Sequence, residues 1–384
     1  MHPLMVPLGF VSLIAAAGYI VLAALAAMAG HRGGLPDSSQ TKPPVTILKP
    51  LCGAEPGLYG NLRSFCTQNY PYFEIIFGVR DAADPACPIV ERLIAEFASL
   101  PIKLIIDPKL HGSNRKVSNL INMLPHADHE LLVMADSDAL VRADYLSTVT
   151  APLRDREVGL VTCLYRAIPT SGIWSRLGAM YVNDWYMPMV LLSWMLGYRG
   201  YVSGQTLCIR QSTLRTIGGL QVLANQLAED HRLGQFVRGL NLKIELSPYL
   251  VEGEHHETDL RSMMSHELRW MRTIRALRPR SFAGLFLTFS LPLALLGIAL
   301  VVAAAPATSP AAWGLFGGCL IARVALHVGP RIRHGQPILS DLWLLPFSDL
   351  LLFWAWCRSL FTSRIAWRNQ EFDVDADGVM HPMP

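Results

Sequence analysis

Hydrophobic residues are distributed unevenly along the chain. Acidic and basic residues occur throughout the region from about residue 40 to about residue 280, whereas they almost vanish towards both ends of the chain. A helix needs about 20 consecutive apolar residues to cross the ~30 Å hydrocarbon core of a bilayer. The pattern therefore predicts membrane segments at both ends and a domain in water between them.

The first membrane segment is predicted at residues 9–30, which carry no charge. Residues 27–29 resemble the cleavage site of a secretory signal peptide. However, no basic segment precedes the apolar run, and the run is longer than a signal peptide requires, so we expect an anchor that is not removed. His31 and Arg32 follow it directly. Because positive charge marks the cytoplasmic flank of a membrane helix, the central domain is expected in the cytoplasm.

Two further membrane segments are predicted at about residues 282–305 and 311–328, joined by a short uncharged turn. Arginines flank the pair before and after it: Arg272, Arg275, Arg278, Arg280, Arg331 and Arg333. Both flanks are therefore expected on the cytoplasmic side, in agreement with the first segment.

The last apolar stretch, residues 338–361, does not fit a simple crossing. It contains Asp341, Pro346 and Asp349, which are costly in a helix exposed to lipid. A full crossing would also place the arginines that follow it on the non-cytoplasmic side. We therefore expect a re-entrant pair of short helices, with the C-terminus returning to the cytoplasm.

The central domain alternates between short apolar runs and helical patterns. Strands are predicted at residues 45–48, 73–79, 102–106, 131–135 and 158–164, with helices at 57–68, 88–100 and 114–124. This alternation predicts an α/β fold with a mostly parallel sheet and helices on both faces. In such sheets, ligands bind beyond the carboxyl ends of the strands.

Composition narrows the class of protein. Charged residues make up 16% of the chain, against about 25% in ordinary soluble proteins. The net charge is +3 and no long Lys/Arg run occurs, so a nucleic-acid partner is not expected. The seven cysteines never have C-x-x-C spacing, which argues against a disulfide framework or a zinc site.

Three aspartates fall at predicted strand ends. Asp81 follows residues 73–79, and Asp136 and Asp138 follow residues 131–135. Two carboxylates on one turn can hold a cation, and oxygen ligands suit Mg²⁺ or Mn²⁺, which share their shell with substrate phosphates. Such an ion would stabilise a diphosphate leaving group. An isolated D-x-D also occurs in solvated turns and helix caps, so the motif alone does not decide between these interpretations.

Three other places carry candidate chemistry. Glu229-Asp230 begins a helical pattern, where a carboxylate either stabilises the helix start or takes a proton from an acceptor hydroxyl. Gly204 belongs to an ordinary turn or lets the backbone approach a donor sugar. His266, Arg269 and Trp270 precede the second membrane segment, where basic and aromatic residues commonly anchor helices.

The aromatic-rich stretch at residues 173–198 has two interpretations. Its tryptophans, tyrosines and methionines are typical of a helix at the membrane interface, where they would shape a lipid entrance. The alternative is a buried core helix, because such side chains often serve packing. We expect the membrane interface.

Taken together, these motifs resemble the signature of a known family. Asp81, Asp136-Ser137-Asp138, Glu229-Asp230 and His266-x-x-Arg269-Trp270 resemble the D, DxD, (E)D, (Q/R)xxRW series of inverting GT-A glycosyltransferases of the ceramide glucosyltransferase type, family 21. The resemblance extends over nearly the whole chain. Residues 48–53, 116–120 and 269–275 are similar to bacterial members, and above all to the hopanoid-biosynthesis branch, which adds N-acetylglucosamine to a bacteriohopane polyol.

The resemblance implies a role for each candidate residue. Asp81 would contact the uridine of a UDP-sugar, and Lys116 would approach its phosphates. Asp136 and Asp138 would hold Mg²⁺ or Mn²⁺, and Asp230 would be the base. Arg269 would reach the diphosphate and Trp270 the acceptor. His266 replaces the family's Gln or Arg, and it can still donate a hydrogen bond to the donor.

The same resemblance implies the reaction and the organisation of the chain. Glucose or N-acetylglucosamine would pass from the UDP-sugar to a lipid hydroxyl, on a ceramide-like or hopanoid polyol acceptor, with no obligate protein partner. The protein would lie in a bacterial inner membrane, with a GT-A (Rossmann-like) catalytic domain in the cytoplasm. The expected parts are an anchor at 1–40, the catalytic domain at 41–265, an interfacial helix at 266–281, and a C-terminal membrane region with a short cytoplasmic tail at 282–384.

Two alternatives remain open at this point. A processive polysaccharide synthase shares these motifs, but it needs a transmembrane channel for which three clear segments are too few. The second alternative is a non-catalytic membrane scaffold or small transporter with a nucleotide-binding domain. Such a protein would show no metal-dependent binding of a UDP-sugar. Within the predicted segments at 282–305 and 311–328, Arg323 is the one charge that could line a transport pathway.

Overall fold

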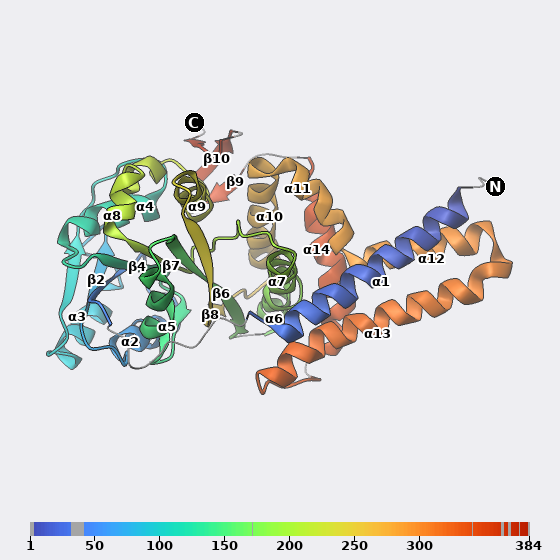
Figure 1. Cartoon of the computed structure of the whole chain (residues 1–384), viewed down its shortest axis with the longest axis horizontal. Helices are drawn as coiled ribbons and strands as arrows, with labels where there is room; N and C mark the ends of the chain where they lie inside the picture. Colours follow the sequence, from blue (N-terminus) through green and yellow to red (C-terminus); the bar gives the residue numbers. More distant parts are fainter. Residues whose placement is uncertain are drawn as a thin grey trace. The chain divides into compact units, whose positions relative to one another are not determined.

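The computed structural model divides the chain into two compact units (Figure 1). It describes residues 4–31, 42–170, 172–339, 341–361, 365–367, 370–375 and 377–382. The unit that we call the membrane unit comprises Met1–Gly30, Pro169–Gly197 and Glu257–Glu371. The α/β unit comprises His31–Ile168, Tyr198–His256 and Phe372–Pro384. Each unit is therefore assembled from segments that are far apart in sequence.

The α/β unit contains, in the described residues, an eight-stranded sheet with the order β3-β2-β1-β4-β7-β6-β8-β5. Its strands are β1 (Val45–Pro50), β2 (Phe73–Val79), β3 (Ile102–Ile106), β4 (Leu131–Ala135), β5 (Ala139–Leu140), β6 (Val158–Pro169), β7 (Thr206–Arg210) and β8 (Lys243–His255). β1 pairs in parallel with β2 and β4, and β2 pairs in parallel with β3. The predicted α/β fold class is confirmed.

The rest of the sheet pairs differently. β7 runs antiparallel to β4 and β6, and β5 runs antiparallel to β8. The predicted strand at residues 158–164 therefore exists as β6, but it lies in this antiparallel part. β1 and β4 are buried almost throughout, which is typical of parallel strands that are covered on both faces.

In the α/β unit, helices alternate with the parallel strands along the chain. They are α2 (Leu58–Cys66), α3 (Cys87–Glu96), α4 (Arg115–Met123), α5 (Tyr145–Thr150), α8 (Gln211–Thr216) and α9 (Glu229–Gly239). Leu120 of α4 and Leu233 of α9 share one hydrophobic core with Leu48 and Leu132 of the sheet. Packing against the same core therefore places the first turns of both helices.

The membrane unit consists mainly of helices. They are α1 (Met5–Ala29), α6 (Gly172–Met180), the π-helical turn η3 (Tyr181–Tyr186), α7 (Met187–Met195), α10 (Leu260–Leu277), α11 (Pro279–Gly284), α12 (Ser290–Ala304), α13 (Ser309–Arg333) and α14 (Leu345–Ser359), followed by the short strand β9 (Ile365–Trp367). Two helices among the described residues, Met5–Ala29 and Pro306–Arg333, are long and apolar enough to cross a membrane. A third crossing exists if Pro279–Thr288 and Ser290–Ala304, which are bent by 64°, form one span.

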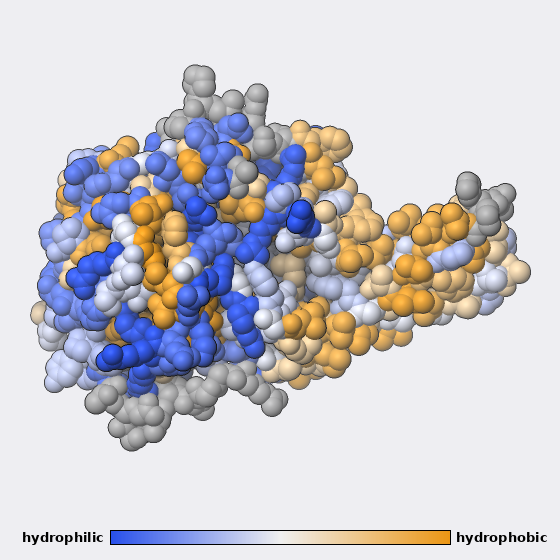
Figure 2. All heavy atoms as spheres, turned by 45° about the horizontal axis from the view of Figure 1, so that its top comes forward, coloured by the Kyte–Doolittle hydropathy of each residue, from blue (hydrophilic) through white to orange (hydrophobic). Residues whose placement is uncertain are grey.

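The candidate spans pack through small residues and present apolar side chains outwards. α1 contacts both α12 and α13. A Cβ added at Gly9 would lie 2.8 Å from the carbonyl oxygen of Gly297, so the backbones of α1 and α12 approach as closely as in small-residue contacts between membrane helices. Val11 and Ile321 are exposed, and Figure 2 shows apolar residues gathered over these helices. Such surfaces fit a lipid environment, as expected for a membrane protein.

The stretch at residues 338–361 contains the 3₁₀ turn η7 (Leu342–Leu344) followed directly by α14. α14 has 15 residues and so extends about 22 Å, which is less than a hydrocarbon core of ~30 Å. It packs against α10 and α12, and Arg275 Nη1 donates to the carbonyl oxygen of Ser359 at 2.7 Å. The cation thus caps the end of α14, where carbonyl groups lack helical partners. The re-entrant arrangement stays a prediction.

The aromatic-rich stretch packs inside the membrane unit. Tyr181, Trp185 and Trp194 are buried, and α7 contacts α1. These side chains thus have the packing role that was the alternative interpretation. Met195 and Leu196, at the end of the stretch, are exposed. The expected lipid entrance stays a prediction.

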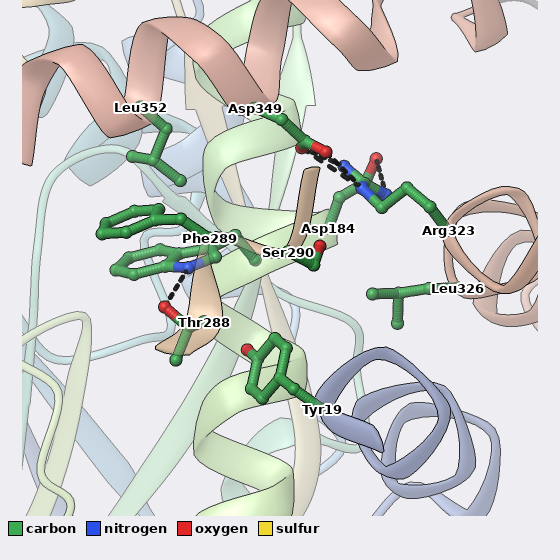
Figure 3. Close-up of a pocket in the computed structure, with 10 residues that line it drawn as sticks. Tyr19, Asp184, Thr288, Phe289, Ser290, Arg323, Leu326, Asp349 and Leu352 are labelled. Carbon is green, nitrogen blue, oxygen red and sulfur yellow. Dashed lines mark hydrogen bonds and ion pairs between the residues drawn. The ribbon is translucent and has the colours of Figure 1, made fainter. Parts of the chain in front are cut away.

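A buried network of charges joins α13 to η3 and α14 (Figure 3). Asp184 of η3 accepts hydrogen bonds from His327 Nδ1 at 2.5 Å and from Arg331 Nη1 at 2.7 Å. Arg323 donates to both carboxylate oxygens of Asp349 of α14, at 2.9 and 2.8 Å. The three α13 side chains are four residues apart and therefore share one helix face. Because an unpaired charge is costly in such a site, the pairs specify how these helices pack.

Removing one partner of this network tests its contribution. Asp184→Ala leaves Arg331 buried without its carboxylate, so we expect the free energy of unfolding to fall by about 3–5 kcal/mol. Thermal unfolding of the detergent-solubilised chain measures this effect. Asp144→Ala, which removes an exposed pair with Arg142, is the control and is expected to cost about 0–1 kcal/mol. Equal midpoints for the two variants would contradict the role of Asp184.

Candidate active site

The turn after β4 places two carboxylates at the carboxyl edge of the sheet. Asp136-Ser137-Asp138 connects β4 to β5. Lys49 of β1 is fully buried, and its Nζ donates to the carbonyl oxygen of Asp136 at 2.7 Å. The same Nζ lies 3.5 Å from the ring centroid of Phe65, a cation–π contact. Burial lowers the pKa of Lys49 to about 7, although the nearby aspartates oppose this shift.

Asp138 has the features of a cation ligand. Its Oδ2 accepts a weak hydrogen bond from Gln205 Nε2 at 3.4 Å, and its Oδ1 is buried without a hydrogen-bond partner among the described residues. Burial, together with the negative charge of Asp136, raises the pKa of Asp138 to about 6. A divalent cation would satisfy the unpartnered oxygen and offset the repulsion between the two carboxylates. The donor set therefore fits Mg²⁺ or Mn²⁺.

Lys116 connects this turn to the start of α9. Its Nζ lies 2.5 Å from Asp136 Oδ1 and 2.9 Å from Glu229 Oε1. Burial by itself lowers the pKa of Lys116, but the carboxylates of Asp136 and Glu229 raise it overall. Asn114 caps α4 by accepting from Val117 N, and it also donates to Glu229 Oε2 at 3.2 Å. The cap thus places the lysine between the two acids.

Asp230 lies beside Lys116 and Gly204. A Cβ added at Gly204 would lie 3.3 Å from Lys116 Nζ and 3.4 Å from Asp230 Oδ2, so a side chain at this position would contact both groups. Burial is the main reason why the pKa of Asp230 is raised to about 7, and the negative charge of Glu229 adds to it. A carboxylate with such a pKa can take up a proton near neutral pH.

Asp81 lies at the same edge of the sheet but apart from this cluster. It follows β2, which is separated from β4 by β1 alone, and the three strands are parallel. Its side chain is exposed and accepts from Ala83 N at 2.9 Å. No described hydrogen bond or ion pair connects Asp81 to Asp136 or Asp230.

Several side chains of the cluster were missed by the sequence analysis. Asp84 accepts from Gly53 N at 3.0 and 3.1 Å and so joins the loops that follow β1 and β2. Lys49 had a visible signal, because a lysine within an otherwise apolar strand needs a buried partner. Asn114 and Gln205 had none, because their partners are distant in sequence.

His266, Arg269 and Trp270 belong to α10 of the membrane unit. α10 begins with a capping box formed by Asp259 and Ser262. The ring of Trp270 meets the rings of Tyr181, Tyr186 and His266 edge to face, at centroid distances of 5.5, 5.2 and 5.5 Å.

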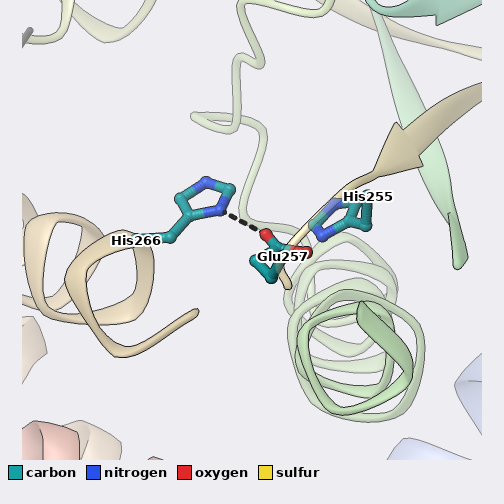
Figure 4. A group of neighbouring side chains, drawn as sticks. All are labelled: His255, Glu257 and His266. Carbon is teal, nitrogen blue, oxygen red and sulfur yellow. Dashed lines mark hydrogen bonds and ion pairs between the residues drawn. The ribbon is translucent and has the colours of Figure 1, made fainter. Parts of the chain in front are cut away.

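Two glutamates, the partly buried Glu257 and the buried Glu267, lie near this end of α10. His266 Nδ1 lies 3.0 Å from Glu257 Oε1 (Figure 4). Burial, together with the charge of Glu257, raises the pKa of Glu267 well above its usual value. Neither glutamate was singled out from the sequence.

Comparison with curated proteins finds ceramide glucosyltransferases. Ceramide glucosyltransferase 1 of Caenorhabditis elegans is 25% identical over 240 residues, covering 62% of this chain and 51% of that protein. Ceramide glucosyltransferase of Candida albicans is 32% identical over 114 residues, covering 27% and 21%. The chain thus spans about half the length, or less, of these curated relatives.

Among solved structures, the mannosyltransferase PcManGT from Pyrobaculum calidifontis, in complex with GDP-Man and Mn²⁺, has a similar fold. Its TM-score is 0.53 and its identity 18%, with 93% of this chain and 99% of that chain covered. The likeness supports the predicted GT-A fold. The model of glycosyl transferase family 21 matches residues 9–380, nearly the whole chain. Because that match includes both units, the chain belongs to glycosyl transferase family 21.

Proposed function

We propose that the protein transfers a hexose from a UDP-sugar to a hydroxyl group of a membrane lipid, with inversion at the anomeric carbon. The observation that carries this proposal is the convergence of Lys116, Asp136, Gly204 and Asp230 at the carboxyl edge of parallel strands. Ligands bind at this edge in open α/β sheets. Membership of family 21 supports the type of reaction.

In this proposal the donor is held from several sides. Asp81 contacts the uridine from the loop after β2. Asp136 and Asp138 hold Mg²⁺ or Mn²⁺, which would stabilise the charge of the leaving diphosphate. Lys116 is the nearest cation for the phosphates. Because Gly204 has no side chain, the sugar can approach Lys116 and Asp230 closely.

Asp230 is the proposed general base. The acceptor oxygen attacks the anomeric carbon as the bond from that carbon to the diphosphate breaks, and the proton of the hydroxyl passes to the Asp230 carboxylate. UDP leaves with the bonding electron pair. A base with a pKa near the operating pH is the most effective in such a transfer. One displacement of this kind inverts the configuration and needs no covalent sugar–enzyme intermediate.

The membrane unit would provide the binding site for the lipid acceptor. Trp270 lies in an aromatic cluster suited to a lipid, and Arg269 and His266 of the same helix would donate to the diphosphate. The similar proteins of Caenorhabditis elegans and Candida albicans bear the name ceramide glucosyltransferase, which supports a lipid acceptor. We propose glucose or N-acetylglucosamine as the sugar and a ceramide-like or hopanoid polyol lipid as acceptor.

We also propose the location and organisation of the chain. The catalytic domain, residues 41–265, would face the cytoplasm from a bacterial inner membrane, because arginines flank the spans on that side. Residues 1–40 would be the anchor, residues 266–281 the interfacial helix and residues 282–384 the C-terminal membrane region with its tail.

The role of Asp230 as the base is tested by replacing its carboxylate with an amide of the same shape. Asp230→Asn cannot accept the proton, so we expect turnover to fall by about 10²–10⁴-fold while UDP binding changes little. UDP release with a lipid acceptor in detergent measures turnover, and calorimetry measures UDP binding. Asp155→Asn, in an exposed turn, is the matched control. Turnover by Asp230→Asn at the rate of the control would remove Asp230 from this role.

The pKa of Asp230 predicts how the reaction depends on pH, and charged neighbours modulate this pKa. Because the base acts when deprotonated, kcat/KM should rise with pH and level off above about 7. Glu229→Gln removes a negative charge that raises this pKa, so the rise should move to lower pH. Lys116→Met removes a positive charge that lowers it, so the rise should move to higher pH. Shifts of both variants in one direction would argue against Asp230.

Metal dependence tests Asp138. EDTA should abolish transfer, and Mn²⁺ or Mg²⁺ should restore it. Gln205→Ala removes a partner of the ligand and should weaken metal affinity by about 10–100-fold, with a larger loss for Asp138→Asn. Electron paramagnetic resonance of bound Mn²⁺ reports affinity independently of turnover. Unchanged Mn²⁺ affinity in Asp138→Asn would show that the metal, if any, binds elsewhere.

A further inference from the structure

The C-terminal end of the chain forms a β-hairpin in the α/β unit. β10 (Gln370–Val374) pairs antiparallel with β11 (Met380–Pro382), with Val374 opposite Met380. Asp375 shapes the turn, since its Oδ1 accepts from the backbone N–H groups of Asp377 and Val379, both at 3.0 Å. Gly378 has φ +81°, which favours glycine. From the sequence alone, only a short cytoplasmic tail is expected here.

This hairpin pairs with the segment that leads to the proposed base. Leu227 N donates to the carbonyl oxygen of Gly378 at 2.9 Å, and Met380 N donates to that of Asn225 at 2.9 Å. Gln226 and Val379 form the antiparallel bridge between these bonds. Gln226 and Met380 are buried, with 7% and 2% of their surface exposed. The hairpin thus supplies backbone partners to residues 225–227, just before Asp230.

The same segment contacts the loop that precedes Lys116. Asn225 Oδ1 accepts from Ser113 N at 2.9 Å, and Ser113 Oγ donates to the carbonyl oxygen of Met380 at 3.3 Å. Asn114 donates through its side chain to the carbonyl oxygen of Gln226 at 2.9 Å. Residues 111–114, residues 224–227 and the hairpin therefore form one connected unit.

Residues 224–228 lie between η4 (Leu220–Leu223) and α9. Ala224 N and Gln226 N donate back to the carbonyl oxygens of Gln221 and Leu223, and the carbonyl oxygen of Ala228 accepts from Arg232 N of α9. Four other backbone groups of the segment have partners in the hairpin and the 111–114 loop: the carbonyl oxygens of residues 224–226 and the N–H of Leu227. Without the hairpin, Leu227 N would lose its acceptor and the carbonyl oxygen of Asn225 would lose its donor. Water would then replace these partners, and the segment would become free to move.

We propose that residues 372–382 are a positioning element that holds the segments bearing Lys116 and Asp230 in one geometry. This inference rests on the proposed function, because it gives those two residues their roles. We assign the hairpin no contact with the substrates. It acts through residues 225–227 and the loop at 111–114. A displacement of about 1 Å of a reacting group can cost about 100-fold in rate, so such support has a measurable effect.

A matched pair of substitutions at Gly378 tests the proposal in the full-length chain. Asn tolerates positive φ, whereas the β-branched Val does not. We expect Gly378→Val to lower kcat by about 10-fold or more, with the KM for the UDP-sugar within about twofold, and Gly378→Asn to recover most of the rate. Gly335→Val, at φ +63° in open space, is the control for strain at a distant glycine.

Hydrogen exchange gives a readout that does not depend on turnover. Amides of residues 224–231 should exchange faster in Gly378→Val than in the wild type and in Gly378→Asn, and those of β1 should not change. Unchanged exchange at 224–231 together with an unchanged kcat would overturn the positioning role. A different result would separate the two proposals. If the wild-type protein transfers no sugar but Gly378→Val still speeds exchange at residues 224–231, the proposed function is refuted and the positioning of the segment stands.

A purely structural role predicts a different result. If the hairpin only stabilised the fold, the melting temperature and the exchange of the β1 amides would change with Gly378→Val, and kcat per folded molecule would stay constant. That outcome would also overturn the proposal. A chain ending at Glu371 provides a second variant. Adding a synthetic peptide of residues 372–384 should restore part of its kcat, and no recovery by a folded truncated chain would count against a local positioning role.

Discussion

The ion pairs of Lys116 are the interaction on which the candidate site depends. This side chain lies between Asp136, at the end of a buried parallel strand, and Glu229, at the start of α9. Without a cation there, carboxylates from two parts of the chain would repel each other in a buried place. Paired with both, Lys116 joins the sheet edge to α9 and leaves Asp230 at its side, beside the backbone of Gly204. The geometry of the candidate site is thus built on an arrangement of opposite charges.

Buried charge has an equally specific role in the membrane unit. Asp184 would be unfavourable in an apolar environment by itself, yet it binds His327 and Arg331, while Arg323 binds Asp349. Each pair can form only when the helices take one relative position. These bonds therefore select one packing of the helices, whereas apolar contacts alone would allow several. The aromatic cluster around Trp270 is built partly from Tyr181 and Tyr186, which share the π-helical turn with Asp184. A charge buried in the unit therefore helps to place the residues proposed to meet the lipid.

Long-range connections also hold the α/β unit together. Its sheet and helices come from the middle of the chain, but the C-terminal hairpin adds backbone partners to residues 225–227. The chain leaves the α/β unit for the membrane helices and returns to it at Phe372. The loop before Asp230 thus has hydrogen-bond partners about 150 residues further along the sequence.

The hydrophobic pattern by itself determined the α/β class, the parallel strands and the apolar spans, because periodicity and run length report local burial directly. The motifs also located Asp136, Asp138 and Asp230 as candidates. Only the tertiary structure decided that β6 is antiparallel, that the aromatic-rich stretch is largely buried, and that β10 and β11 form a hairpin. It also revealed Lys49 beneath the turn. These features depend on partners far away in the sequence, and a local pattern contains no information about which distant group will satisfy a buried charge or a backbone N–H.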